Sequence, residues 1–176
     1  MDASRTQKFK AALAKVGTYH DGLGKKVDPG IKKTVALLNL LGFETVMSCA
    51  GHMRPDHGTL TPWIDVLIEN KKKEEKFRTL VRSYWQDSKS WARQQVTSLF
   101  IDDYALKTDR SALRLESGMD ILTNIKRDKK RIPEAVREWF YKEGTKEMRH
   151  FTEYLQDVFE GKKKPSKKAP KGRQSD

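Results

Sequence analysis

Apolar residues recur every three or four positions in four stretches of the chain, and this spacing predicts amphipathic helices. The stretches cover residues 5–16, 28–42, 77–92 and 133–160. The second has the clearest ends, because Asp28 and Pro29 are typical of a helix start and Gly42 is typical of a C-cap. In the last stretch Gly144 interrupts the apolar stripe, so we expect a kink or a break there.

Four shorter stretches are rich in β-branched and aromatic residues, which predicts strands. They cover residues 43–48, 63–68, 99–104 and 112–115. The last two are expected to form a hairpin around residues 107–110, and a Gly- and Pro-containing loop separates the first two. We interpret Lys71–Lys73 as the start of a polar linker. The order of these elements predicts an α+β fold, with a small, mostly antiparallel sheet covered by helices on one face.

The composition fits a single domain with a short tail. Of 176 residues, 36% are hydrophobic and 34% are charged, and we place the α+β domain at residues 1–160. The Lys-rich segment 161–176 has little apolar surface to bury and is predicted to be disordered. No apolar run is long enough to predict a membrane span, and the N-terminal residues do not resemble a secretory signal. The single cysteine, Cys49, cannot form an internal disulfide, which agrees with a cytoplasmic location.

The net charge of +12 favours a polyanionic partner such as nucleic acid. Half of this excess lies in residues 161–176, which hold seven Lys or Arg and one acid. Basic clusters near the predicted element boundaries are candidate contacts to phosphates. These clusters are Lys71, Lys72 and Lys73, then Lys129, Lys130 and Arg131, and finally Lys162, Lys163 and Lys164. The alternative interpretation is that the runs are solvated faces and that the tail only promotes solubility.

One segment, residues 48–65, concentrates the chemically versatile side chains. It holds the only cysteine, two of the four histidines, a serine, an arginine and two carboxylates. They are Ser48, Cys49, His52, Arg54, Asp56, His57 and Asp65. Because functional groups are often placed on loops between rigid strands, this segment is the predicted active or binding site.

The first interpretation of the segment is nucleophilic chemistry. A cysteine attacks as its thiolate, which a neighbouring imidazolium favours. Cys49 would be the nucleophile, His52 its partner, and Asp65 on the next strand would orient the imidazole. We expect these three side chains to converge, with Arg54 or His57 at the rim. The structural alternative is that Cys49 is a small buried residue and that Asp65 caps the loop.

Two further interpretations involve a bound ligand. Cys49 and His52 have the spacing of a chelating turn, and His57 is a third potential ligand, which together suggest a zinc site. In the other interpretation, Gly51 and Arg54 hold an anion through backbone N–H groups and the guanidinium. The structural alternative for both histidines is a solvated position in a loop.

Several short motifs carry a resemblance to known proteins. The segments Asp28–Ile31, Leu37–Thr45, Ser48–His52 and Pro62–Asp65 resemble a group of small bacterial and phage-type proteins, which share a helix, a strand ending in S-C-x-G-H and a Pro-Trp strand. The S-C-A-G part is also similar to the S-C-S-G-R motif of the methyltransferase family that acts third in tRNA wybutosine synthesis, with His52 in place of the motif's Arg. That similarity implies S-adenosylmethionine as cofactor and tRNA as substrate.

Together these observations predict a nucleic-acid-associated protein, directed to RNA, whose functional loop is Ser48–Asp65. The first alternative is a small-molecule enzyme that uses Cys49 and His52, or a metal ion bound by them. The second is a phage-type interaction module that holds the acidic face of a protein partner and performs no chemistry. A membrane partner is not expected.

Overall fold

The computed structural model describes residues 2–20, 24–53, 59–87, 100–105, 111–116 and 133–166. Within these ranges the chain forms four helices and four strands. The helices are α1 (Ala3–Val16), α2 (Lys32–Leu40), α3 (Lys71–Asp87) and α6 (Glu134–Phe159). The strands are β1 (Thr45–Cys49), β2 (Trp63–Ile68), β3 (Phe100–Ala105) and β4 (Ser111–Glu116).

The strands form one antiparallel sheet in the order β1-β2-β4-β3. β1 pairs with β2 so that Cys49 lies opposite Trp63 and Met47 lies opposite Asp65. β2 pairs with β4 along its whole length, and β3 pairs with β4 in the predicted antiparallel arrangement. The predicted α+β fold with a mostly antiparallel sheet is therefore confirmed.

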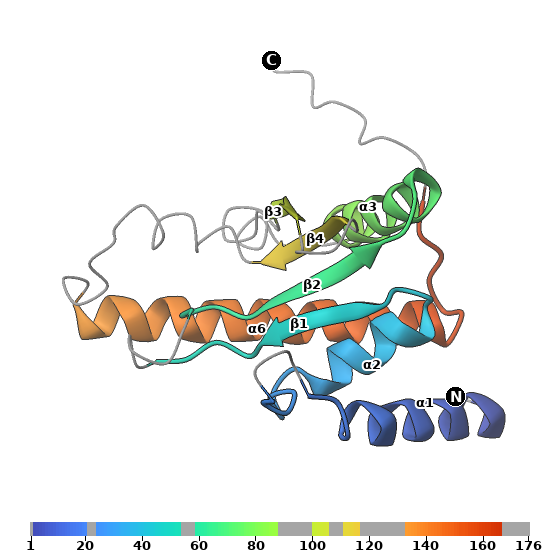
Figure 1. Ribbon diagram of the computed structural model, residues 1–176, viewed down its shortest axis with the longest axis horizontal. Coiled ribbons are helices and arrows are strands. Elements are labelled where there is room, and N and C mark those ends of the chain that lie inside the picture. Colours follow the sequence, from blue (N-terminus) through green and yellow to red (C-terminus); the bar gives the residue numbers. More distant parts are fainter. Residues whose placement is uncertain are drawn as a thin grey trace, which may run out of the picture.

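The hydrophobic core lies between one face of the sheet and the helices. Successive residues of a strand point to opposite faces, so Ile64, Val66 and Ile68 of β2 share one face. These three residues belong to a core that also contains buried residues of all four helices. Figure 1 shows α6 running behind β1 and β2, with α2 and α3 on either side of it. Trp63 and Asp65 point to the opposite face of the sheet.

Helix α2 is shorter than the predicted stretch 28–42. The helix begins after Ile31, which caps it without a side-chain hydrogen bond, and the predicted N-cap residue Asp28 is not used as a cap. Asp28 instead accepts the backbone N–H of Ile31 through its carbonyl, and its carboxylate is bound by the loop after β1. At the other end, Gly42 adopts φ +87°, as the predicted helix stop requires. Leu38 has no exposed surface.

Helix α6 is continuous over Glu134–Phe159, so the predicted break into two helices at Gly144 is wrong. A β-carbon at Gly144 would lie 2.8 Å from Thr61 Cγ2 and 3.3 Å from Pro62 Cδ. The glycine therefore lets the helix backbone approach the segment that leads into β2. Although α6 has 26 residues, neither it nor any other helix in the described ranges is apolar enough to cross a bilayer.

Helix α3 begins at Lys71, so residues 71–73 form its first turn rather than a linker. The side chain of Asn70 accepts the backbone N–H of Lys73 at 3.0 Å and thereby satisfies one of the free donors at the helix start. Phe77, Leu80 and Val81 then place the apolar side of α3 in the core, as their helical spacing predicts.

Residues 161–166 leave α6 and return to α3. The backbone N–H of Ser166 donates to Ser83 Oγ at 2.7 Å, and the same hydroxyl lies 3.2 Å from the carbonyl of Ser166. Lys162 donates to Glu160, and this hydrogen bond lowers the pKa of the Glu160 carboxyl. Hydrogen bonds to α3 thus hold the chain for a few residues past the predicted domain boundary at residue 160, although most of these residues are exposed. The rest of the predicted tail, residues 167–176, lies outside the described residues.

Candidate functional site

Three side chains from separate segments meet beside the end of β1. Cys49 is the last residue of the strand, His52 follows in the loop, and Asp28 lies in the segment before α2. One donor atom from each residue lies within 4.8 Å of the other two, and His52 Nε2 is 3.7 Å from Asp28 Oδ2. Cys49 is buried, whereas the side chains of His52 and Asp28 are each 35% exposed. The cluster is therefore accessible from solvent on the side of these two residues.

The backbone after β1 fixes the shape of this cluster. Gly51 adopts φ +83°, and a β-carbon there would lie 2.6 Å from the carbonyl oxygen of Leu60, so only glycine fits without strain. The N–H of His52 donates to the carbonyl of Thr59 at 2.8 Å, which closes the base of the loop. The N–H of Ala50 donates to Asp28 Oδ2 at 3.1 Å and holds the carboxylate beside the strand end.

The sulfur of Cys49 acts as a hydrogen-bond acceptor. The backbone N–H of Gly51 donates to it at 3.4 Å. The Thr59 hydroxyl lies 3.8 Å from the sulfur, but its single proton is shared with the carbonyl of Thr61 at 3.1 Å. The N–H of Gly51 is therefore the donor that orients the sulfur within the cluster.

Asp65 is engaged away from this cluster. Its side chain has no exposed surface and accepts two parallel hydrogen bonds from Arg114 of β4, at 2.8 Å from Nε and 2.9 Å from Nη2. The guanidinium carbon of Arg114 also lies 4.2 Å from the ring centre of Trp63. The carboxylate near His52 is thus that of Asp28. The prediction that Asp65 orients the imidazole of His52 is wrong, because the Asp65 carboxylate is bound by Arg114. The reason is register, since Asp65 pairs with Arg114 across the sheet.

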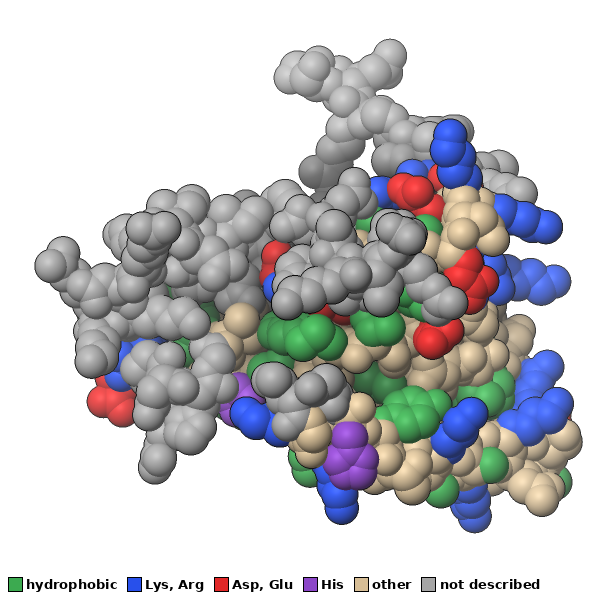
Figure 2. All heavy atoms as spheres, in the orientation of Figure 1, with side chains coloured by type: hydrophobic (Ala, Val, Ile, Leu, Met, Phe, Trp, Pro, Cys, Tyr) green, Lys and Arg blue, Asp and Glu red, His purple; other side chains and the backbone are tan. Residues whose placement is uncertain are grey.

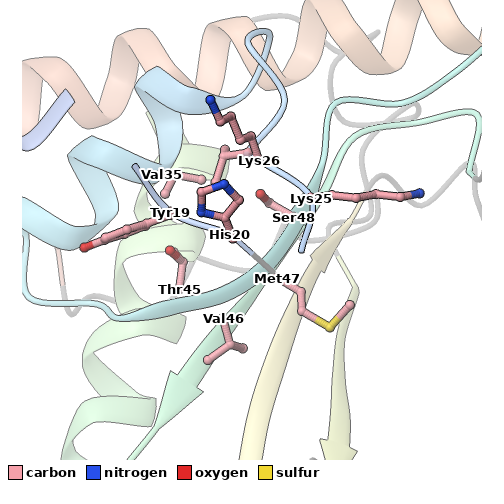
Figure 3. A pocket seen from close by; sticks show the side chains of 10 residues that line it. Tyr19, His20, Lys25, Lys26, Val35, Thr45, Val46, Met47 and Ser48 are labelled. Carbon is pink, nitrogen blue, oxygen red and sulfur yellow. The ribbon is translucent and has the colours of Figure 1, made fainter. Parts of the chain in front are cut away.

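Ser48 lines a different feature, a cavity of about 280 Å³ beside the edge strand β1 (Figure 3). The segment after α1 forms the other wall and contributes Tyr19, His20, Lys25 and Lys26. Backbone pairing between His20 and Lys26 holds that segment together. Figure 3 shows the His20 ring between Tyr19 and Ser48. The described lining has three basic or imidazole side chains and no carboxylate, so it suits an anionic group.

The other predicted site residues are surface positions or lie outside the described ranges. Among the described ones, four are exposed: Lys71, Lys72, Lys162 and Lys164. Three form ion pairs with nearby carboxylates: Lys73, Lys162 and Lys163. The predicted residues outside the described ranges are Arg54, His57, Lys129, Lys130 and Arg131.

The sequence interpretation missed Asp28, Arg114 and Thr59 as partners of the predicted residues. A signal for Arg114 was present, because it stands between Leu113 and Leu115 in a strand, as Asp65 stands between two apolar residues in β2. Two lone opposite charges on half-buried strands suggest a cross-strand ion pair. No comparable local signal identified Asp28, whose Asp-Pro pattern is equally typical of a helix start.

Comparisons with protein-family models, with curated proteins and with solved structures found no match to the chain. The resemblance of the S-C-A-G-H segment to bacterial and phage-type proteins, and to the tRNA-modifying methyltransferases, therefore stays a prediction. Function has to be argued from the geometry of the sites themselves.

Proposed function

We propose that the protein associates with nucleic acid, and specifically with RNA, through a basic surface centred on α1. The main support is the charge of this helix, which contains four Lys or Arg and no Asp or Glu. Lys8, Lys10 and Lys15 are exposed and form no ion pair within the described part of the chain. Lys8 and Lys15 lie two turns apart on one side of the helix, while Phe9, Leu13 and Val16 face the core.

Several cations on the other long helices are compensated by neighbouring acids, whereas Lys71 and Lys72 of α3 are exposed like the lysines of α1. On α3, Lys73 pairs with Glu69 and Arg78 pairs with Glu74. On α6, two lysines form similar pairs, Lys142 with Glu138 and Lys146 with Glu143. Such paired charges attract a polyanion weakly, because each cation already has a counter-charge. Figure 2 shows blue side chains and no red ones along the α1 side of the molecule in this view.

The cavity beside β1 supports the same proposal because it continues the basic surface. Helix α1 leads directly into the wall that contains Tyr19 and His20, and Lys25 and Lys26 follow on the same wall. Its volume of about 280 Å³ is suited to one phosphate group or one unstacked base. Proteins that bind single-stranded nucleic acid use such side chains: aromatic rings and imidazoles stack on the bases, and lysines contact the phosphates.

RNA is preferred to DNA in this proposal because the S-C-A-G segment is similar to a tRNA-modifying family. The same similarity makes S-adenosylmethionine the proposed cofactor if the protein also modifies its RNA. A cytoplasmic location stays the expectation from the single cysteine.

The test is a fluorescence anisotropy titration of labelled single-stranded RNA, and of DNA of the same sequence, over a series of salt concentrations. We expect binding that weakens linearly on a log–log plot, and tighter binding to RNA. The double variant Lys8→Glu/Lys15→Glu should flatten the slope by roughly 1.4, since each lost contact to a single strand removes about 0.7. The matched control, Lys142→Glu/Lys146→Glu on α6, should change the slope much less. Equal effects of the two variants, or no binding at low salt, would refute the proposal.

A second candidate function, an enzyme centred on Cys49, is favoured by a separate observation. A thiol, an imidazole and a carboxylate converge at the end of β1 in a position accessible to solvent. The interaction-module alternative makes a different prediction, namely that the basic surface binds an acidic protein and gives no RNA signal in the assay above.

A further inference from the structure

We propose that Asp28, Cys49 and His52 bind one zinc-type divalent metal ion and leave a fourth coordination position for water or a ligand. The inference is independent of nucleic-acid binding. Its basis is that a carboxylate oxygen, a sulfur and an imidazole nitrogen from three segments have mutual distances within 4.8 Å. Those are the three donor types that zinc uses in proteins.

The separation between the His52 nitrogen and the Asp28 oxygen is closer to the ligand spacing around a tetrahedral ion than to a direct hydrogen bond. His52 Nε2 and Asp28 Oδ2 are 3.7 Å apart, which exceeds a normal N–H···O distance. Bonds of about 2.0–2.3 Å from a tetrahedral metal ion to its ligands place those ligands roughly 3.3–3.6 Å from one another. Movements of the partly exposed His52 and Asp28 side chains, starting from donor separations within 4.8 Å, would be needed to reach that geometry.

Hydrogen bonds from the backbone orient Asp28 and Cys49. Asp28 Oδ2 accepts the N–H of Ala50, and the sulfur of Cys49 accepts the N–H of Gly51. Metal ligands in proteins are commonly held in this way by outer hydrogen bonds, which fix the ligand and tune its charge. The donors are therefore preorganised by the backbone, and binding would require little ordering of the chain.

The backbone of the cluster is also closely packed. Gly51 lies against the carbonyl of Leu60, where any β-carbon would collide. A β-carbon at Gly30 would lie 3.2 Å from the β-carbon of Ala50, so the segment that carries Asp28 lies directly against the strand end. These contacts keep the ligand-bearing segments at a fixed separation, as a metal site requires.

The donor set selects the class of ion. A thiolate and an imidazole are preferred by zinc and similar transition metals, whereas Ca²⁺ and Mg²⁺ prefer oxygen ligands. A bound thiolate and carboxylate together neutralise a divalent charge. Three protein ligands with a fourth position for water are typical of sites where a metal acts on a substrate.

A thiol nucleophile assisted by His52 is the rival explanation of the same cluster. That mechanism needs the carboxylate to orient the imidazole through a hydrogen bond of roughly 2.6–3.2 Å. The separation of 3.7 Å between His52 Nε2 and Asp28 Oδ2 is longer than this range. The convergence of three zinc-type donors within 4.8 Å favours the metal site, and the alkylation experiment below separates it from the free thiol.

The test uses the full chain, purified without a histidine tag, stripped with a chelator and titrated with Co²⁺ and then with Zn²⁺. We expect one equivalent of Co²⁺ to bind, with visible ligand-field bands and a near-ultraviolet sulfur-to-cobalt charge-transfer band, and Zn²⁺ to displace it. Cys49→Ser should remove the charge-transfer band. His52→Ala and Asp28→Asn should each raise the Kd for Zn²⁺ by about 100-fold or more. The matched control His20→Ala, outside the cluster, should bind the metal like the parent protein.

Asp28→Asn also guards against loss of folding, because the amide oxygen can still accept the N–H of Ala50; far-UV circular dichroism checks each variant. The proposal is overturned if Co²⁺ does not bind, if the charge-transfer band is absent, or if Cys49→Ser leaves the affinity unchanged. It is also overturned if Zn²⁺ does not slow the alkylation of Cys49 by iodoacetamide. Alkylation at an unchanged rate is the result expected if Cys49 is a free nucleophile. Loss of RNA binding with intact metal binding would affect only the function proposed above.

Discussion

The buried ion pair between Asp65 and Arg114 gives the sharpest test of the fold around the candidate site. Replacing Arg114 with Met removes both hydrogen bonds, at 2.8 and 2.9 Å, and leaves a carboxylate with no exposed surface. Breaking a buried pair from one side typically costs about 3–5 kcal/mol, because the remaining charge is uncompensated. We therefore expect the free energy of unfolding of Arg114→Met to fall by about that amount.

Substitution of the other partner, Asp65→Asn, should lower the free energy of unfolding by less. The Arg114 side chain is 24% exposed, so after Asp65→Asn the guanidinium can regain water, and the amide oxygen can still accept one hydrogen bond. The loss is then closer to that of a single charge-assisted hydrogen bond, about 1.5–3 kcal/mol. Arg114→Met also removes the contact of the guanidinium with the Trp63 ring, worth about 0.5–1 kcal/mol, which widens the difference.

The assay is urea unfolding at neutral pH, followed by tryptophan fluorescence and circular dichroism, for both single variants and the double variant. Residues in direct contact should show a coupling energy of at least about 1 kcal/mol in this cycle. The control is Arg78→Met, which breaks an i,i+4 pair with Glu74 in which both side chains are about one third exposed and which should cost about 0.5 kcal/mol or less. This account of Asp65 would be refuted if Arg114→Met lowered the free energy of unfolding no more than Arg78→Met does. It would also be refuted if the effects of Arg114→Met and Asp65→Asn were additive in the double variant.

Three further predictions follow from the packing. Leu38→Ala should lower the free energy of unfolding by about 2–5 kcal/mol, because the side chain is fully buried. Gly144→Ala should lower the free energy of unfolding by about 1–3 kcal/mol, although alanine favours helices, because its β-carbon would collide with Thr61. Urea unfolding measures the effects of Leu38→Ala and Gly144→Ala, and a more stable Gly144→Ala variant would contradict the observed packing. Deleting residues 167–176 should leave Tm unchanged, whereas deleting 162–176 also removes the hydrogen bonds of Ser166 and should lower Tm by about 2–4 °C in a calorimetric scan.

The sequence by itself determined the local elements. The apolar spacing in α2 and α6, the alternation in β2 and the stop at Gly42 each depend on residues within one or two turns, so they are readable without the fold. The proximity of Cys49 and His52 belongs to the same class, because only two residues separate them and Gly51 permits the turn.

Only the tertiary structure decided which distant groups became partners. Asp28 meets the loop after β1 from a segment 22 positions before Ala50, and Arg114 meets Asp65 across 49 positions. Gly144, a helix breaker by propensity, stays within a continuous α6 because its missing side chain lets the helix pack on Thr61. In each case the outcome depends on which strands pair, in which register, and how closely the layers approach. Burial of the whole core sets these features, and no short stretch of sequence encodes them.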